Sequence, residues 1–196
     1  SDVYKRQGYV APPECAESTG KNIAVVGGGP GGLSAAYFLQ LMGHQVTVYE
    51  MLPKLGGMLR YGIPNYRLPK ERLDDDIQAI LDTGVKVDCG KAIGKDYSIV
   101  DLKEKYDAVL ITIGASTDKK LGLEGEDAQG VISAVQFLRN VGYGTQESLE
   151  GKEVAVIGGG NVSMDAVRTS VRLGAKKVSI VYRRRVADTV SYTHLR

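Results

Sequence analysis

The sequence predicts an α/β fold with two Rossmann-like domains, because one pattern of strand, glycine turn, helix and strand occurs twice. The first copy covers residues 21–50 and includes a run of six glycine and proline residues. The second copy covers residues 153–182, where Gly158 and Gly160 repeat the glycine spacing of the first copy. Each copy therefore predicts two parallel strands joined by a helix.

In the first copy, residues 23–26 form a short β-branched run that predicts a strand. Residues 33–42 carry helix-forming side chains, and Gly43 marks the end of that helix. A second strand is predicted at residues 45–49, with Glu50 at its end. The glycine turn therefore joins the first strand to the helix.

This turn carries the spacing G-x-G-x-x-G from Gly27 to Gly32. In such a turn the first glycine permits the tight bend, the second lets the backbone approach a pyrophosphate, and the third lets helix and strand pack closely. Glu50 stands at the distance beyond the motif where an acidic residue accepts a hydrogen bond from a ribose hydroxyl. The predicted ligand-binding residues of the first copy are Gly27, Gly29, Pro30, Gly31, Gly32 and Glu50.

Two other interpretations of this stretch are weaker. Residues 23–43 hold no charge and are long enough to cross a membrane, but the six glycine and proline residues would break a spanning helix. A glycine-rich loop without a ligand would leave the placement of Glu50 unexplained. Dinucleotide binding is the preferred interpretation.

Residues 51–69 predict an ordered loop rather than a helix or strand, because glycine and proline recur through it. Large apolar side chains such as Met58 and Tyr61 stand between the glycines, a mixture that suits backbone pressed against a flat apolar ligand. The alternative is a loop folded onto the core of its own domain.

The elements between the two copies follow from periodicity and capping. Residues 107–113 predict a buried strand that ends at Gly114, where backbone can again approach a ligand. Ser98 is the expected cap of one helix, and Ser133 with Gln136 forms a capping box for another. The predicted elements are helices at 70–83, 98–106 and 133 to about 140, and strands at 85–87 and 107–113.

The second copy predicts a strand at 153–157, a helix to residue 173 and a strand at 177–182, with Ser163 in place of the third glycine. Three arginines, residues 183–185, follow its last strand, where the first copy has Glu50. A carboxylate at this point favours a free 2′-hydroxyl, whereas an arginine favours the 2′-phosphate of NADP(H). The alternative for the arginine run is a solvated basic patch.

Composition limits the class of protein. The chain is 43% hydrophobic and 24% charged. These fractions are usual for a soluble globular protein, and the net charge of +2 suggests no nucleic-acid or membrane partner. The two cysteines, Cys15 and Cys89, cannot form a disulfide scaffold, a C-x-x-C pair or a self-contained iron–sulfur or zinc site. Without a visible signal peptide, the expected location is the cytoplasm.

Two dinucleotide sites in one chain indicate two cofactors that meet. One is NADP(H), and the other, beside a glycine-rich apolar loop suited to a flat ring, is best interpreted as FAD. Hydride transfer from nicotinamide to flavin needs alignment of the rings but no acid or base from the protein. We therefore predict no catalytic side chain and no metal ligand.

Several stretches resemble the small (beta) subunit of NADPH-dependent glutamate synthase. They include GGGPGGLSAAYFLQLMGHQVTVYE, LGGMLRYGIPNYRLPKERL and VIGGGNVSMDAVRTSVRLGAKKVSIVYRRR, and the likeness covers about residues 21–188. The N-terminal half of dihydropyrimidine dehydrogenase and the large subunit of NADPH–ferredoxin transhydrogenases are similar. The resemblance implies a truncated two-dinucleotide-binding fold of the pyridine nucleotide-disulfide oxidoreductase kind.

The resemblance also implies residue roles. The motif of the first copy, with Glu50, binds the ADP half of FAD. Residues implied to lie along the rest of the flavin are Gly57, Leu59, Arg67, Ile113 and Gly114. Residues implied to hold the NADPH pyrophosphate are Gly158, Gly160, Asn161 and Val162, with Arg183 and Arg184 on the 2′-phosphate.

The resemblance implies that electrons pass from NADPH through FAD to iron–sulfur clusters in an electron-accepting subunit or domain. The cysteine-rich cluster domain of the family and the segment that completes its FAD domain are both missing from this sequence. Residues 1–7 and those from about 190 onward resemble translated sequencing-adaptor sequence, so a fragment is expected. The sequence therefore predicts four parts. Residues 1–20 are a linker whose start is artefactual, and residues 190–196 are an artefactual tail. Between them lie part of an FAD-binding domain at 21–122 and a truncated NADPH-binding domain at 123–189.

There are three alternatives to this function. A flavin disulfide reductase would need a cysteine pair near the flavin, which this sequence does not provide. A non-catalytic nucleotide-binding or subunit-docking module would keep the fold without turnover. Another NAD(P)H–flavin oxidoreductase, such as a ferredoxin–NADP transhydrogenase, would share the same two sites.

Overall fold

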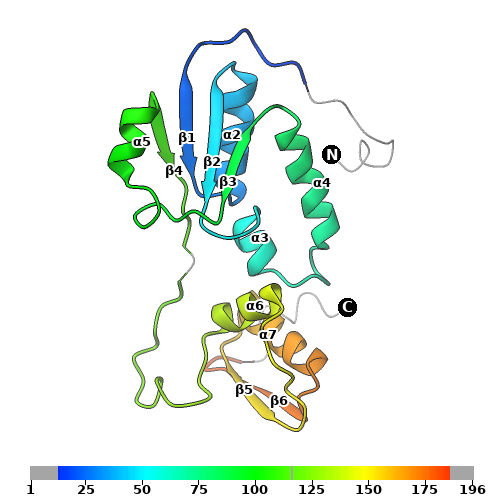
Figure 1. The fold of residues 1–196 in the computed structure, drawn as a ribbon. Coiled ribbons are helices and arrows are strands. Elements are labelled where there is room, and N and C mark those ends of the chain that lie inside the picture. The colour runs from blue at the N-terminus through cyan, green and yellow to red at the C-terminus, as the bar shows by residue number, and fades with distance from the viewer. Residues whose placement is uncertain (1–12, 116, 186–196) are drawn as a thin grey trace. The chain divides into compact units, whose positions relative to one another are not determined.

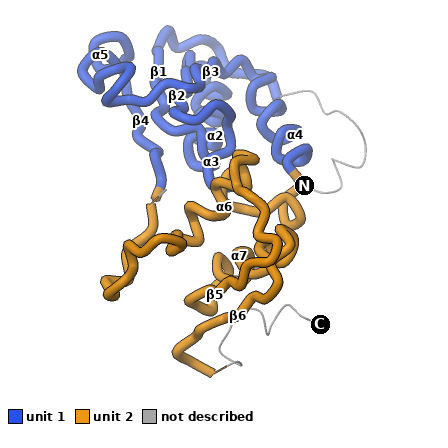
Figure 2. The backbone as a smooth tube through the Cα atoms, turned by 60° about the horizontal axis from the view of Figure 1, so that its bottom comes forward, with its two compact units in different colours: residues 1–59, 70–114 blue, residues 60–69, 115–196 orange. Residues whose placement is uncertain are grey.

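The structure is a computed structural model that describes residues 13–115 and 117–185 (Figure 1). The artefactual ends predicted at residues 1–7 and 190–196 lie outside the described residues. The chain forms two compact units, of which unit 1 comprises Ser1–Leu59 and Lys70–Gly114 (Figure 2). Unit 2 comprises Arg60–Pro69 and Ala115–Arg196. Each unit is described by itself below.

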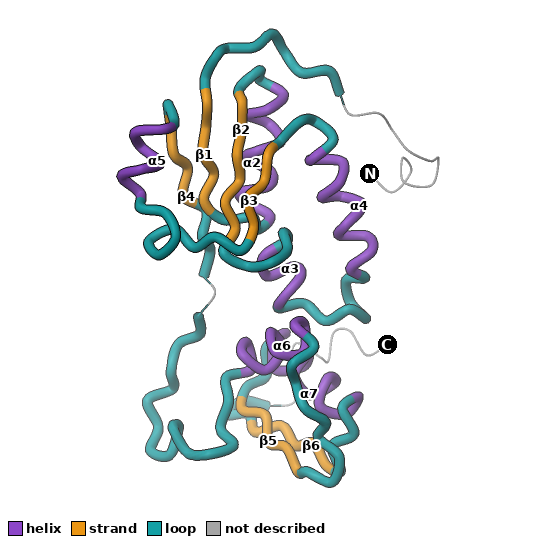
Figure 3. The backbone as a smooth tube through the Cα atoms, in the orientation of Figure 1, coloured by secondary structure: helices purple, strands orange, loops and turns teal. Residues whose placement is uncertain are grey.

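Unit 1 contains a four-stranded sheet in the order β3-β2-β1-β4, and every neighbouring pair is parallel (Figure 3). Its strands are β1 (Asn22–Val26), β2 (Gln45–Glu50), β3 (Lys86–Cys89) and β4 (Ala108–Ile111). Its helices are α2 (Pro30–Leu41), α4 (Lys70–Leu81) and α5 (Ile99–Lys105), and α3 (Gly57–Tyr61) begins in it. Helices between parallel strands are the connection that such pairing requires.

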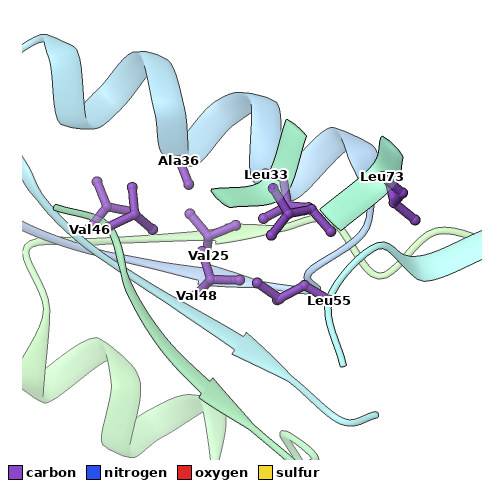
Figure 4. Packing of buried hydrophobic residues seen from close by; sticks show 9 residues of the cluster. Val25, Leu33, Ala36, Val46, Val48, Leu55 and Leu73 are labelled. Atoms are coloured by element: carbon purple, nitrogen blue, oxygen red, sulfur yellow. The ribbon is translucent and has the colours of Figure 1, made fainter. Parts of the chain in front are cut away.

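Side chains alternate between the two faces of this sheet, as they do along any strand. Val25 of β1 with Val46 and Val48 of β2 points to the face that α2 and α4 cover (Figure 4). There Leu33 of α2 and Leu73 of α4 pack against them. This cluster is the main core of unit 1.

The neighbouring residues in sequence point to the opposite face. Ala24 and Val26 of β1 and Tyr49 of β2 form a second cluster with Leu102 of α5. Because both faces are covered, β1 at the centre of the sheet is a continuous apolar run from residue 23 to residue 26 rather than an alternating one.

Helices α2 and α7 (Asn161–Arg172) end in the same way, at the glycines that the sequence identified. Gly43 follows α2 with φ 86°, and its N–H donates to the Gln40 carbonyl at 3.0 Å. Gly174 follows α7 with φ 86°, and its N–H donates to the Val171 carbonyl at 3.1 Å. Left-handed backbone of this kind favours glycine, so both predicted helix ends are confirmed.

Unit 2 contains a two-stranded parallel sheet of β5 (Glu153–Ile157) and β6 (Lys177–Val181). Phe137 and Leu138 of α6 (Ala134–Tyr143) pack with Val156 of β5 and Ala166 of α7. The apolar residues Ile157 and Val181 at the ends of the strands are exposed. The core of unit 2 therefore lies between the sheet and its two helices.

Three local predictions need correction. Residues 57–61 form α3, because Met58 to Tyr61 are a helix-compatible run that outweighs the flanking glycines and prolines. Strand β4 exists but is not buried: Ile111 is 59% exposed, since among the described residues β4 pairs only with β1. Only half of the predicted capping box forms: the Ser133 hydroxyl accepts the Gln136 N–H, but the Gln136 side chain donates to Asn140.

Within the described part of the chain, no helix is both long enough and apolar enough to cross a membrane. The stretch 23–43 is divided between β1, the glycine turn and the short helix α2. The membrane-span interpretation of these residues is therefore wrong.

Candidate nucleotide-binding sites

The first glycine turn lies at the carboxyl end of β1, where the strand order reverses. β2 and β3 lie on one side of β1, and β4 lies on the other. The Gly27 N–H donates to the Tyr49 carbonyl at the end of β2 at 2.8 Å, and the Thr112 hydroxyl, just after β4, donates to the Gly27 carbonyl at 3.0 Å. Ligands of open parallel sheets bind at such a reversal, beyond the carboxyl ends of the strands.

Two glycines of this turn occupy positions that a larger residue could not. Gly27 has φ 109°, and a Cβ built on it would lie 2.5 Å from the Thr112 carbonyl oxygen. A Cβ on Gly32 would overlap the Gly27 carbonyl oxygen. The first and third glycines of the motif thus provide the tight bend and the close approach of helix and strand that the spacing predicts.

Helix α2 begins without a side-chain cap. Its N-cap is Gly29, Pro30 is its first residue, and no side chain accepts a hydrogen bond there. The first N–H groups of a helix have no acceptor within the helix, and the helix dipole makes this end positive. A Cβ built on Gly31 would meet no atom within 4 Å, so the helix start is open and suits a phosphate group.

Glu50 joins the glycine turn to the chain that follows β2. Its side chain is buried, with the residue 5% exposed, and Oε2 accepts the Gly28 N–H at 2.7 Å. Oε1 accepts the Leu52 N–H at 2.8 Å. A carboxylate offers about four acceptor positions, so two remain for the hydroxyl groups of a ribose.

The loop after β2 returns to the same turn. The Gly56 N–H donates to the Gly28 carbonyl at 2.8 Å, and a Cβ on Gly57 would lie 2.8 Å from the Gly29 Cα. Gly57 also has φ 51°, which favours glycine. The structure therefore brings Gly57 directly against the first glycine motif.

The other residues implied to lie along the flavin are more scattered. Leu59 packs against the main core cluster of unit 1. Ile113 follows β4 and is 68% exposed, and Gly114 has open space around a built Cβ. Arg67 belongs to unit 2, where it pairs with Asp165.

The second glycine turn, in unit 2, follows β5. Gly158 has φ 129°, and a Cβ on it would lie 2.6 Å from the Ser163 hydroxyl oxygen. Gly160 is the N-cap of α7 without a side-chain cap, and a Cβ on it would meet no atom within 4 Å. Asn161 and Val162, the first residues of α7, are exposed. This helix start is thus open in the same way as that of α2.

The predicted arginines lie at the same edge of the small sheet as the second glycine turn. β5 and β6 are parallel with Ile157 opposite Val181, so their carboxyl ends meet at one edge. A Cβ on Gly159 would lie 2.7 Å from the Tyr182 ring. Arg183 and Arg184 follow Tyr182 and are exposed, which leaves their guanidinium groups accessible to a phosphate.

Sequence reasoning missed two polar residues. Thr112 donates to the carbonyls of both Val26 and Gly27 at 3.0 Å and so secures the first turn, and no pattern in the sequence marks it. Asp165 is 4% exposed on α7 and binds Arg67. No pattern in the sequence marks Asp165 either, because adjacent residues of a helix point about 100° apart and the apolar Ala166 beside it does not place it in the core.

The cysteines do not form a redox centre in the described part of the chain. Burial raises the pKa of the Cys89 thiol, and the nearby Glu50 carboxylate raises it further, which disfavours the reactive thiolate. The Cys15 thiol donates to the Thr83 carbonyl at 3.6 Å. Neither cysteine offers the thiol chemistry that a flavin disulfide reductase requires.

Curated relatives share much of this chain. NADP(+)-dependent formate dehydrogenase subunit beta of Moorella thermoacetica is 46% identical over 175 residues, which are 88% of this chain and 25% of that protein. The glutamate synthase [NADPH] small chain of Escherichia coli is 39% identical over 178 residues, 86% of this chain and 38% of that protein. The chain thus spans well under half the length of either relative.

Among solved structures, FprA from Mycobacterium tuberculosis in complex with NADPH matches with a TM-score of 0.72 and 26% sequence identity. The match covers 86% of this chain and 45% of FprA. It confirms the predicted α/β fold with two Rossmann-like domains.

A comparison with protein families matches residues 21–191 to the pyridine nucleotide-disulphide oxidoreductases. The family and the curated relatives are those of NAD(P)H-dependent oxidoreductases, the enzyme class that the sequence predicts, and they support the predicted cofactors, FAD and NADPH. The chain belongs to the pyridine nucleotide-disulphide oxidoreductase family.

Proposed function

We propose that this chain is the part of an oxidoreductase in which hydride passes from NADPH to FAD, and from which electrons pass on to a partner subunit or domain. The observation that supports it best is the difference between the two glycine turns. The first is joined to a buried carboxylate, Glu50, and the second is followed by the exposed Arg183 and Arg184. Two dinucleotides of different chemistry fit these two ends.

At the first site, the N–H groups at the start of α2 are proposed to bind the FAD pyrophosphate. Gly27 and Gly32 shape the turn, and the open space at Gly31 admits the phosphates. The two remaining acceptor positions of Glu50 would take the ribose hydroxyls. Gly57, whose backbone already lies against Gly29, is proposed to line the path toward the flavin ring.

At the second site, Gly160, Asn161 and Val162 are proposed to bind the NADPH pyrophosphate at the start of α7. Arg183 and Arg184 would bind the 2′-phosphate through charge-assisted hydrogen bonds. When bound, the two cofactors supply the hydride donor and the hydride acceptor, and the chain supplies their alignment. The residues Ile113 and Gly114 are proposed to border the flavin at the end of β4.

The electron acceptor is proposed to be an iron–sulfur subunit or domain outside this chain. Relatives are named as a subunit beta and as a small chain, so they work with other subunits. This chain covers only part of their length, and its two cysteines cannot hold a cluster on their own. A cytoplasmic location stays a prediction.

An absorbance spectrum of the purified chain with added FAD tests this proposal first. We expect a bound-flavin spectrum that loses its absorbance on anaerobic addition of NADPH and much more slowly with NADH. Bound flavin that NADPH leaves oxidised would refute hydride transfer and favour the non-catalytic docking module.

Replacement of Arg183 and Arg184 by alanine tests the NADPH assignment. Each lost charge-assisted phosphate contact is expected to cost about 1.5–3 kcal/mol, or roughly 10–150-fold in NADPH affinity. NADH binding should change little, because NADH lacks the 2′-phosphate. Lys176→Ala with Lys177→Ala is the matched control, since it removes two charges from the opposite end of β6. If the arginine variant binds NADPH and NADH more weakly by the same factor, the assignment of this site to NADPH is refuted.

A further inference from the structure

The segment Arg60–Pro69 leaves unit 1 and packs as part of unit 2; we call this segment the strap (Figure 2). Unit 1 ends on one side of the strap at Leu59 and resumes on the other side at Lys70. The Lys70 ammonium donates to the Leu59 carbonyl at 2.9 Å and so closes the base of the strap. The strap is therefore a loop with both ends anchored in unit 1 and its body in unit 2.

The far end of the strap is bound to α7 by Arg67 and Tyr66, and the Tyr66 hydroxyl donates to the Asp165 Oδ1 at 3.4 Å. The Arg67 guanidinium Nη1 lies 2.6 Å from the Asp165 carboxylate Oδ2, and the Asp165 side chain is only 6% exposed. Tyr66 stacks under Arg172, with the guanidinium carbon 3.9 Å from the ring centroid. Burial raises the pKa of Tyr66, so its hydroxyl stays protonated at neutral pH. These contacts join neighbouring residues of the strap to the same helix.

The near end of the strap is packed against α6. The rings of Tyr61 and Tyr143 lie 4.9 Å apart between centroids. Gly142 permits this approach, since a Cβ on it would lie 3.2 Å from the Tyr61 carbonyl oxygen. The strap is thus held at both ends by helices of unit 2, and Arg67 with Asp165 is its charged contact.

The position of this ion pair in the chain links it to both proposed sites. Asp165 lies on α7 less than two helical turns after Gly160, the N-cap of that helix. The strap begins shortly after Gly57, whose backbone lies against Gly29 of the first glycine motif. The strap therefore follows directly in sequence on the segment that carries Gly57, and it is bound to the helix that begins at Gly160.

We propose that Arg67 and Asp165 are positioning residues for hydride transfer, because their ion pair holds the strap on the helix whose start binds NADPH. This inference rests on the proposed function. It gives Arg67 a role through Asp165 in place of direct contact with the flavin. A buried carboxylate suits this role, because it holds its partner in one geometry and is costly to leave unpaired.

The test compares Arg67→Met, Arg67→Lys, Asp165→Asn and the double variant R67M/D165N in the FAD-loaded chain. Arg72→Met is the matched control, because Arg72 pairs with Asp75 at 3.9 Å on an exposed face of α4. Hydrogen–deuterium exchange of residues 60–69 without nucleotide measures how firmly the strap is bound to the helices of unit 2. The rate of flavin reduction at saturating NADPH, and NADPH affinity measured separately, report its effect on the reaction.

We expect Arg67→Met to speed exchange at residues 67 and 68, whose N–H groups donate to the Pro64 carbonyl, by at least about tenfold. Flavin reduction should slow by a similar factor, with flavin retention and NADPH affinity within about twofold of wild type. The rates of exchange and of flavin reduction in Arg67→Lys should lie between those of wild type and Arg67→Met, because lysine keeps the positive charge but lacks the planar guanidinium group. The double variant should exchange more slowly than Arg67→Met, since it leaves no unpaired buried charge.

Two results would overturn the inference while leaving the proposed function standing. In the first, the strap of the Arg67→Met variant exchanges hydrogen for deuterium at the same rate as the strap of the wild type and of Arg72→Met. The other is faster exchange with an unchanged rate of flavin reduction, which would make the ion pair purely structural. Wild-type chain that binds flavin but is not reduced by NADPH would reject the proposed function and, with it, the positioning role.

Discussion

Replacement of Glu50 separates a structural role of this residue from its proposed role in binding ribose. Glu50 accepts two backbone N–H groups, from Gly28 at 2.7 Å and from Leu52 at 2.8 Å, in a site where the residue is 5% exposed. A hydrogen bond to a charged group contributes about 1.5–3 kcal/mol. Glu50→Ala removes both acceptors, so we expect the free energy of unfolding to fall by roughly 3–6 kcal/mol, a large part of a typical value of about 5–15 kcal/mol.

Glu50→Gln is the finer perturbation. A glutamine side chain keeps one carbonyl oxygen, so it can accept from only one of the two N–H groups, and its amide nitrogen faces the other. The expected loss is about 1.5–3 kcal/mol, half that of Glu50→Ala. Urea unfolding followed by circular dichroism, without FAD, measures this loss free of any ligand effect. Glu104→Gln, on the exposed face of α5, is the matched control and should leave the midpoint unchanged.

A Glu50→Gln chain as stable as wild type without FAD would refute the structural role and the reasoning from these two hydrogen bonds. A second measurement addresses the ribose. Glu50→Ala and Glu50→Gln should both release FAD more readily than wild type, beyond what their lower stability explains. Unchanged FAD retention in a folded variant would count against ribose binding by Glu50.

The remaining predictions concern the first helix start and a helix cap. Gly32→Ala should prevent FAD binding and lower the unfolding midpoint, because its Cβ would overlap the Gly27 carbonyl oxygen. Gly31→Ala has open space for its Cβ and should be as stable as wild type or more so. Equal melting temperatures of the two variants would contradict the close packing at Gly32. The pKa of Asp101 is lowered chiefly by the Ser98 N–H, so its contribution to stability should be present above the unfolded pKa of about 3.9 and disappear as pH falls through the lower folded value. Asp101→Asn should therefore have a lower melting temperature than wild type at neutral pH but not in strong acid. A difference in melting temperature that persists in acid would show that the charge of Asp101 is not its cause.

The sequence predicted the elements whose signals are local. The strand at 153–157 is confirmed to the residue, and the helix of the first copy is confirmed with an earlier start, at Pro30, and an end at Leu41. Glycine spacing predicted both turns, because Gly27 and Gly158 have a positive φ that strongly favours glycine. Ser98 was expected as a cap, and the structure adds the reciprocal bond, in which the Ser98 N–H donates to the Asp101 carboxylate.

What the sequence could not predict depends on contacts between distant residues. An apolar run such as 108–111 indicates a strand but does not reveal how many neighbours the strand has, so the exposure of β4 was missed. The attachment of residues 60–69 to unit 2 rests in part on Arg67 and Asp165, which are 98 residues apart. No local pattern in either segment encodes that pairing. The cofactor roles of individual residues stay predictions.

The strap has a consequence for the order in which the chain acquires structure during synthesis. All four strands of the sheet in unit 1 have been made once β4 ends at Ile111, so that sheet can assemble early. The ion pair of Arg67 cannot form until Asp165 is synthesised, 98 residues later. At ordinary rates of chain elongation this wait is on the order of 10 s. Until then, Tyr61 and Tyr66 lack the helices that cover them. In the interval between synthesis of the strap and synthesis of α7, the strap is therefore open to proteases and to wrong apolar contacts.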